Sequence, residues 1–103
     1  MTENEILFNY RQAMKQADRL DEIAQKIEKL AAGKMESTIG TLKNAWQSDN
    51  SALYYNKMNR VQEEILEDAA DVKKVAQSIR TTAESIKRAE LRALELAKSR
   101  TYR

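Results

Sequence analysis

Apolar side chains in the first half of the chain recur at the spacing of one helix face. They are separated alternately by four and three residues, in the order Ile6, Tyr10, Ala13, Ala17, Leu20, Ala24, Ile27 and Ala31. This alternation is a heptad repeat, and it predicts a helix over about residues 4–46 that packs along a seam. Ile23 and Leu30 widen the seam. The repeat slips near Gly33 and Lys34, which predicts a kink or a stutter in the helix at that point.

The second half carries a more regular repeat, in which steps of three and four residues continue without interruption. Its members are Met58, Val61, Ile65, Asp68, Val72, Val75, Ile79, Thr82, Ile86, Ala89, Ala93 and Leu96. Only Asp68 and Thr82 among them are polar. The repeat predicts a second helix over about residues 51–98, followed by a basic tail, 99–103, that frays.

The segment between the two repeats, from Trp46 to Ser51, is polar and rich in residues that favour turns and helix caps. It predicts a tight turn at about residues 47–50. Because so short a connection leaves no room for a crossover, the two helices must lie antiparallel. The predicted fold class is therefore all-α. We expect one helical hairpin domain over residues 1–103, assembled with a second hairpin into a four-helix bundle.

The amino-acid composition excludes several classes of function, because three residue types are absent. The chain has no His, no Cys and no Pro. Without His and Cys it cannot build a zinc finger, a thiol nucleophile or a Ser-His-Asp triad. Its 18 Lys and Arg against 16 Asp and Glu give a net charge of +2, which is too small to favour nucleic acid as a partner. We therefore expect a protein that is not an enzyme, with no catalytic residue, cofactor or metal ligand.

The sequence also lacks the patterns that direct a chain into a membrane. Its first residues are acidic and lead only into Ile6-Leu7-Phe8, which does not resemble a secretory signal peptide. No run approaches about 18 apolar residues, so we expect no integral membrane segment. These features predict a soluble protein, and they leave open export by a system that reads folded helices.

Two helices packed together make a poor core, and this predicts a helical protein partner. Several large apolar residues lie off the narrowest seam and stay partly exposed in a lone hairpin: Ile23, Leu30, Leu66, Leu91 and Leu94. An exposed side chain of this size forgoes about 1.5–3 kcal/mol of stabilisation. We expect the partner interface to use Ile65, Val72, Val75, Ile79 and Ile86, in a homodimer or a heterodimer. A monomeric hairpin with scattered exposed leucines is the alternative.

Asp68 and Thr82 interrupt the second repeat and have two interpretations. As buried polar groups they would fix the register and the choice of partner, with Arg19, Lys26 or Lys29 as a cation for Asp68. Alternatively, the stripe turns toward solvent at these two positions.

Trp46 is the only tryptophan of the chain and falls at the predicted turn. We expect its ring to bridge the ends of both helices. A chain of about one hundred residues, helical throughout, with the tripeptide Trp46-Gln47-Ser48 at the turn, resembles the WXG family of small type VII secretion substrates. Ser48 stands where that family has Gly, and it is small enough to keep the close approach of the ring.

The resemblance implies a non-enzymatic protein of a bacterial type VII secretion system. Such a protein is a secreted substrate, or a helical targeting partner of a larger effector such as an LXG-type toxin. It is cytoplasmic before export and is then secreted by the type VII route. Tyr102 is followed only by Arg103, so the family's Tyr-x-x-x-acid signal is not seen. The resemblance then implies either the partner that lacks the signal or a chain exported through a different signal. A coiled-coil scaffold or regulator that docks onto an unrelated helical protein is the alternative function.

Overall fold

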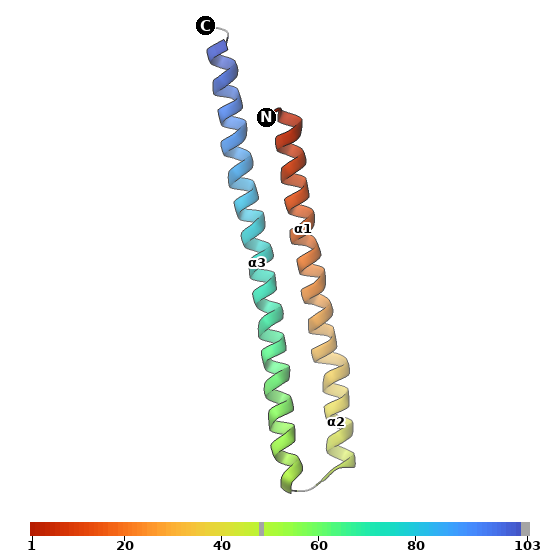
Figure 1. Cartoon of the computed structure of the whole chain (residues 1–103). Helices are drawn as coiled ribbons and strands as arrows, with labels where there is room; N and C mark the ends of the chain where they lie inside the picture. The colour runs from red at the N-terminus through yellow and green to blue at the C-terminus, as the bar shows by residue number, and fades with distance from the viewer. Residues whose placement is uncertain (48, 102–103) are drawn as a thin grey trace. The chain divides into compact units, whose positions relative to one another are not determined.

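The computed structural model describes residues 1–47 and 49–101. It shows an all-α, antiparallel helical hairpin, which confirms the predicted fold class (Figure 1). The first arm consists of α1 (Glu3–Lys29), the π-helical segment η1 (Leu30–Met35) and α2 (Glu36–Ala45). The second arm is the single helix α3 (Asp49–Thr101). It extends into the segment 99–103 that was expected to fray, of which Tyr102 and Arg103 lie outside the described residues.

Thr2 caps the start of α1. The Thr2 hydroxyl accepts a hydrogen bond from the Glu5 backbone N–H at 3.2 Å and donates one to the Glu5 carboxylate at 3.2 Å. The hydroxyl thereby satisfies one of the backbone N–H groups that the first helical turn leaves open. Glu3 and Glu5 in this turn also place negative charge at the positive end of the helix dipole.

The predicted slip in the first repeat lies within the π-helical segment η1. Buried residues of the first arm are seven positions apart at Ala17, Ala24 and Ala31, but the next one, Ile39, follows after eight. A π-helical turn absorbs one extra residue without breaking the helix. The wide turn therefore shifts the helical phase by one position and keeps Ile39 on the buried side.

The chain forms two compact units. Unit 1 comprises residues 1–20 and 74–101, and unit 2 comprises residues 21–73. In each unit a segment of the first arm packs against a segment of α3. Small residues dominate the contact: the buried residues of unit 1 are Ile6, Ala17, Ala76 and Ala83, and those of unit 2 are Ala24, Ala31, Ile39, Ser51, Tyr55, Gln62 and Ala69.

The buried seam of α3 differs from the predicted one by a single position. It runs through Tyr55, Gln62, Ala69, Ala76 and Ala83, which are seven residues apart. Four of these positions directly follow members of the predicted repeat, which are themselves exposed: Val61, Asp68, Val75 and Thr82. Alanine on both arms lets the helices approach closely, because the interaxial distance depends on the size of the contacting side chains. The larger aliphatic residues therefore flank the seam instead of filling it.

Candidate partner interface

Polar pairs close one side of the seam in unit 1. The Lys87 ammonium lies 4.1 Å from the centre of the Tyr10 ring and 3.2 Å from the Glu84 carboxylate. One heptad earlier on α3, the Arg80 guanidinium donates to Asp18 at 2.8 Å. The contacts of Lys87 with Tyr10 and of Arg80 with Asp18 join α3 to α1, whereas Lys87 and Glu84 both belong to α3. This side of unit 1 therefore meets water with charged and aromatic groups that already have partners.

Glu84 lies in a cluster with Tyr10, Lys87 and Arg88, which we call the Tyr10 cluster and which favours its ionised form. A hydrogen bond from Tyr10, followed by the hydrogen bond and charge of Lys87, lowers the pKa of Glu84 below its ordinary value. The charged carboxylate in turn attracts Lys87 and Arg88, whose Nε lies 3.3 Å away. The cluster thus ties three residues of α3 to the first turns of α1.

An apolar groove lies on the other side of the seam in unit 1. A residue three positions beyond a seam position is rotated about 60° to one side, and a residue four positions beyond is rotated about 40° to the other. Arg80 and Lys87 lie four positions beyond the seam residues Ala76 and Ala83, on the side with the polar pairs. Ile79 and Ile86 lie three positions beyond the same residues, on the opposite side. The groove has a volume of about 460 Å³ and is lined by Ala13, Lys74, Val75, Ser78, Ile79, Thr82, Ala83 and Ile86.

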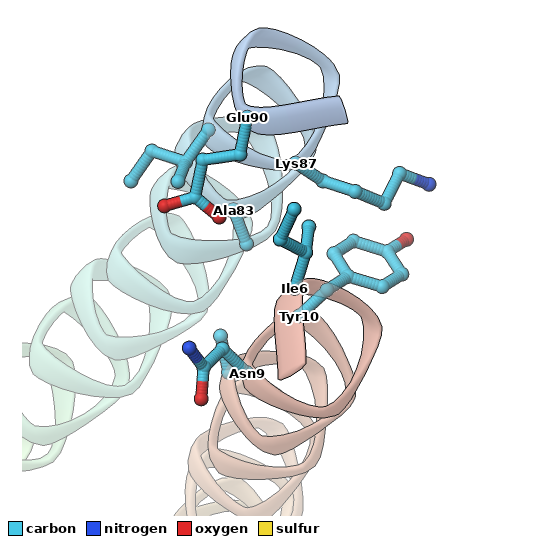
Figure 2. A pocket seen from close by; sticks show the side chains of 8 residues that line it. Ile6, Asn9, Tyr10, Ala83, Lys87 and Glu90 are labelled. Atoms are coloured by element: carbon cyan, nitrogen blue, oxygen red, sulfur yellow. The ribbon is translucent and has the colours of Figure 1, made fainter. Parts of the chain in front are cut away.

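A smaller pocket adjoins this groove near the N-terminus of α1 and shares Ala13, Ala83 and Ile86 with it. Figure 2 shows Ile6 and Tyr10 of α1 facing Ala83 and Lys87 of α3 across the pocket. Its volume of about 210 Å³ is below that of ordinary small-molecule sites. The pocket is of a size to receive an apolar side chain from a partner helix.

Unit 2 has the same division into a bridged side and an apolar side. The Lys73 ammonium pairs with the Glu28 carboxylate at 2.6 Å. Met58 lies on the other side of the α3 seam, since it follows Tyr55 by three positions. It lines a second groove of about 400 Å³ with Leu30, Lys34, Met35, Thr38, Ile39 and Leu42. Ile23 and Leu30 are 50% and 55% exposed in this unit.

All five predicted interface residues lie outside the intramolecular seam. Val75, Ile79 and Ile86 line the groove of unit 1, and Val75 and Ile86 are 53% and 51% exposed. Ile65 and Val72 are half-buried in unit 2, at the same heptad position as Met58. The large apolar residues that were expected to stay partly exposed do so: Ile23 and Leu30 are exposed, and Leu66, Leu91 and Leu94 are half-buried. The partner that covers them remains a prediction.

Asp68 and Thr82 are exposed, each directly before a buried alanine of the seam. They therefore flank the seam instead of lying in it. This agrees with the interpretation that the stripe turns toward solvent in the single chain. A role in specificity stays a prediction that concerns the surface presented to a partner.

Trp46 lies at the end of the first arm, and its ring contacts α3. It is the C-cap residue of α2, with an extended backbone (φ −127°, ψ 95°), and its N–H donates to Leu42 at 2.8 Å. Its ring lies 5.3 Å from that of Tyr54, at 38° between planes. The ring reaches the second arm as expected, yet it is 44% exposed. Ser48, the other predicted turn residue, lies outside the described residues.

Tyr55 provides the buried closure of the turn, a role that the sequence pattern did not reveal. It is 8% exposed. Its hydroxyl donates to the carbonyl oxygen of Leu42 at 2.6 Å and to that of Trp46. The Lys43 ammonium lies 5.7 Å from the centre of its ring. Ala69, Ala76 and Ala83 are seven residues apart on α3. The same spacing continued two heptads toward the N-terminus reaches Tyr55, and this signal could have identified Tyr55 as a seam residue.

Gln62 is the second seam residue that the pattern missed. Its side chain is buried, and its Nε2 donates to the Ala31 carbonyl oxygen and to the Glu36 carboxylate, each at 2.6 Å. Ala31 belongs to η1, where the widened turn alters the backbone hydrogen-bond ladder. Gln62 therefore supplies from the opposite arm a donor that an aliphatic residue could not offer.

The described residues contain no group of three or more Asp and Glu side chains placed to hold a metal ion. Among the helices that the structure describes, none is both long and apolar enough to cross a membrane. Comparison of the chain with protein families, curated proteins and solved structures found no match. Its function is therefore inferred from the sequence and from the geometry of the two grooves.

Proposed function

We propose that this chain is a non-enzymatic protein that binds a helical partner through the apolar sides of its two units. The observation that carries the proposal is the groove of unit 1, in which Val75, Ile79 and Ile86 line one apolar surface. Val75 and Ile86 retain about half of their surface exposed. A partner helix laid in this groove would remove apolar surface from water, at about 25 cal/mol per Å².

The bridged side of each unit supports the same proposal. Its ion pairs already satisfy the charged groups there, so no partner is needed to cover them. A partner on the apolar side would leave these pairs at the polar rim, which is the usual arrangement of an interface with an apolar centre.

We further propose that the chain is a WXG-like protein of a bacterial type VII secretion system. The hairpin fold and Trp46 at the end of the first arm support this proposal. The chain would serve as a secreted substrate or as a targeting partner of a larger effector, such as an LXG-type toxin. It would be cytoplasmic before export and would leave the cell by the type VII route.

Co-purification tests the binding function. The chain is co-expressed with the helical N-terminal region of an effector encoded beside it, and the complex is measured by size-exclusion chromatography with light scattering. We expect a stable complex that Val75→Glu weakens and Phe8→Glu does not. Phe8 is a matched control because it is 58% exposed and lines neither groove. Equal effects of the two substitutions would contradict the proposal.

Secretion tests the cellular role. A tagged chain is followed by immunoblot in the culture medium of cells with and without the type VII export ATPase. We expect the chain, or the effector that depends on it, to reach the medium only when the ATPase is present. Export that is indifferent to the ATPase would leave a helix-binding protein of another system.

A further inference from the structure

The small pocket near the N-terminus of α1 contains a carboxylate at a seam position of α3. Seam residues of α3 are seven positions apart, and the position after Ala83 is Glu90. The seam residues before it, from Tyr55 to Ala83, are all buried and none of them is charged. Glu90 is half-buried and lines the pocket. Packing between the two arms does not require a charge there, since glutamate is rarely withdrawn from water without a partner.

The Glu90 carboxylate is not neutralised within unit 1. Among the residues that the structure describes, it takes part in no ion pair or hydrogen bond. Lys87 and Arg88, the two cations that precede it on α3, pair instead with Glu84 at 3.2 and 3.3 Å. Figure 2 shows the Lys87 ammonium on one side of the pocket and the Glu90 carboxylate, with the Asn9 amide, on the other. The charge of Glu90 is therefore available to a group from outside the chain.

The wall of the pocket is largely apolar and encloses room for one bulky side chain. Ile6 and Ala13 of α1 and Ala83 and Ile86 of α3 line it. An apolar cavity of about 150 Å³ is sufficient to bind benzene, so the volume of about 210 Å³ is enough for the ring of a phenylalanine. The Tyr10 ring, which also lines the pocket, favours an aromatic occupant because aromatic pairs gain energy beyond the area they bury.

From these features we propose that the pocket anchors the partner helix through one large apolar side chain, of about the size of phenylalanine, and that Glu90 pairs with a lysine or arginine one helical turn from that anchor. The inference rests on the proposed helix-binding function and specifies the chemistry of the partner. The pocket shares Ala13, Ala83 and Ile86 with the groove of unit 1, so a helix in the groove reaches both. Side chains three or four positions apart lie on the same face of a helix.

The pairing with Glu90 supplies a specificity that the apolar groove lacks. Burial of apolar surface is not directional, so the groove by itself accepts many helices with an apolar face. A partner that covers Glu90 without offering a cation removes water from the carboxylate and returns nothing for it, which is unfavourable. A partner with an acidic residue at that place adds repulsion. Such penalties against the wrong partner are a general source of specificity.

Small aromatic probes test the pocket on the full-length chain. Binding of 4-phenylbutylamine, 4-phenylbutyrate and butylamine is followed by NMR through the methyl signals of Ile6 and Ile86. We expect the aromatic ammonium ion to bind in the millimolar range and about threefold or more tighter than the aromatic carboxylate. Butylamine, which has no ring, should shift neither signal. Equal affinities for the two aromatic probes, or no binding of either, would overturn the proposal.

A matched pair of variants assigns the charge preference to Glu90. Glu90→Gln should abolish the preference for the ammonium probe and retain binding of the ring. Glu95→Gln, at an exposed position of α3 outside the pocket, should leave the preference unchanged. If Glu90 had only a structural role, Glu90→Gln would lower the melting temperature and leave the preference as it is, and this result would overturn the proposal.

The complex with the helical N-terminal region of an effector tests the same pairing in an interface. Glu90→Lys should weaken that complex about fivefold or more, and Glu95→Lys should change it by less than about twofold. Far-ultraviolet circular dichroism must show unchanged helicity, and Glu90→Gln takes the place of Glu90→Lys if it does not. If the region binds both variants equally well, the pairing is wrong and the proposed function stands. If the probes show the preference but the region does not bind, the pocket stands and the effector is not the partner.

Discussion

The side chain of Gln62 donates a hydrogen bond to the carbonyl oxygen of Ala31, 2.6 Å away and inside the π-helical turn of the opposite arm. Because the same nitrogen also donates to Glu36, one buried amide ties the phase shift of the first arm to a fixed point on α3. The other contacts between the two arms are largely between alanines, and alanine side chains alone do not distinguish one register from another. We regard Gln62 as the residue that sets their register in unit 2.

Replacement of Gln62 by Leu should therefore destabilise the chain although Leu is apolar. The substitution leaves the Ala31 carbonyl without this donor in a buried place, which costs about 1–3 kcal/mol. Urea denaturation followed by circular dichroism measures the loss. Gln77→Leu, at an exposed position of α3, should stay within about 0.5 kcal/mol of the wild type. A Gln62→Leu variant of wild-type stability would show that the amide has no such role.

The two adjacent tyrosines of α3 should differ in their response to loss of a hydroxyl. Tyr55→Phe removes the hydrogen bonds to the carbonyl oxygens of Leu42 and Trp46, and we expect a loss of about 0.5–1.5 kcal/mol in the free energy of unfolding. Tyr54→Phe makes the same chemical change at a residue that is 53% exposed and should be nearly neutral. Equal losses in the two variants would argue against a buried closure of the turn by Tyr55.

Trp46 and Tyr55 can be ranked by truncation. Trp46→Ala removes an exposed ring that lies tilted against that of Tyr54, whereas Tyr55→Ala opens the buried end of the seam. We expect a decrease of several degrees in melting temperature for Trp46→Ala and a larger one for Tyr55→Ala. The opposite order, measured by thermal unfolding in dilute solution, would restore Trp46 as the main clamp.

Enlargement of a seam alanine tests the close approach of the two arms. Ala76 is fully buried, and Ala76→Leu must separate the helices or distort them, at a cost of about 1–3 kcal/mol. Ala70→Leu adds the same atoms at an exposed position of α3 and should change stability little. A stable Ala76→Leu variant would mean that the seam has room that alanine does not fill.

The Tyr10 cluster predicts a pH dependence with a definite sign. Because the pKa of Glu84 is lowered in the folded chain, the stabilisation from its charged form is present above the unfolded pKa and is lost as the pH falls through the folded pKa. Tyr10→Phe removes the leading cause, so the pKa of Glu84 should rise toward its ordinary value. Carbon-detected NMR titration of the Glu84 carboxyl in both proteins measures this shift. An unchanged titration would exclude the hydrogen bond.

The sequence predicted the hairpin, since each arm carries a long heptad repeat and only one polar segment interrupts them. It also located the slip near Gly33, because the phase change is visible in the order of apolar residues. It did not reveal that the slip is a π-helical turn, which is stabilised by Gln62 from 31 positions away in the sequence. Contacts between residues so far apart leave no local periodicity from which to infer them.

The seam of α3 was misplaced by one position for a related reason. Val61, Val75 and Ile86 are larger and more apolar than Ala69 and Ala76, so they dominate any pattern based on hydrophobicity. The two arms select small residues, however, because alanine permits the closest backbone approach. The larger side chains that the pattern emphasised stay about half exposed in the single chain.

An alanine seam buries little apolar surface when the hairpin closes, so we expect the free energy of unfolding of the isolated chain to be small. Its melting temperature should climb with concentration or with added partner, by mass action on the bound state. In a cell, chains that are not bound to a partner would unfold more often and would be degraded first by proteases. The small area buried in this seam would thus match the amount of the protein to the amount of its binding partner.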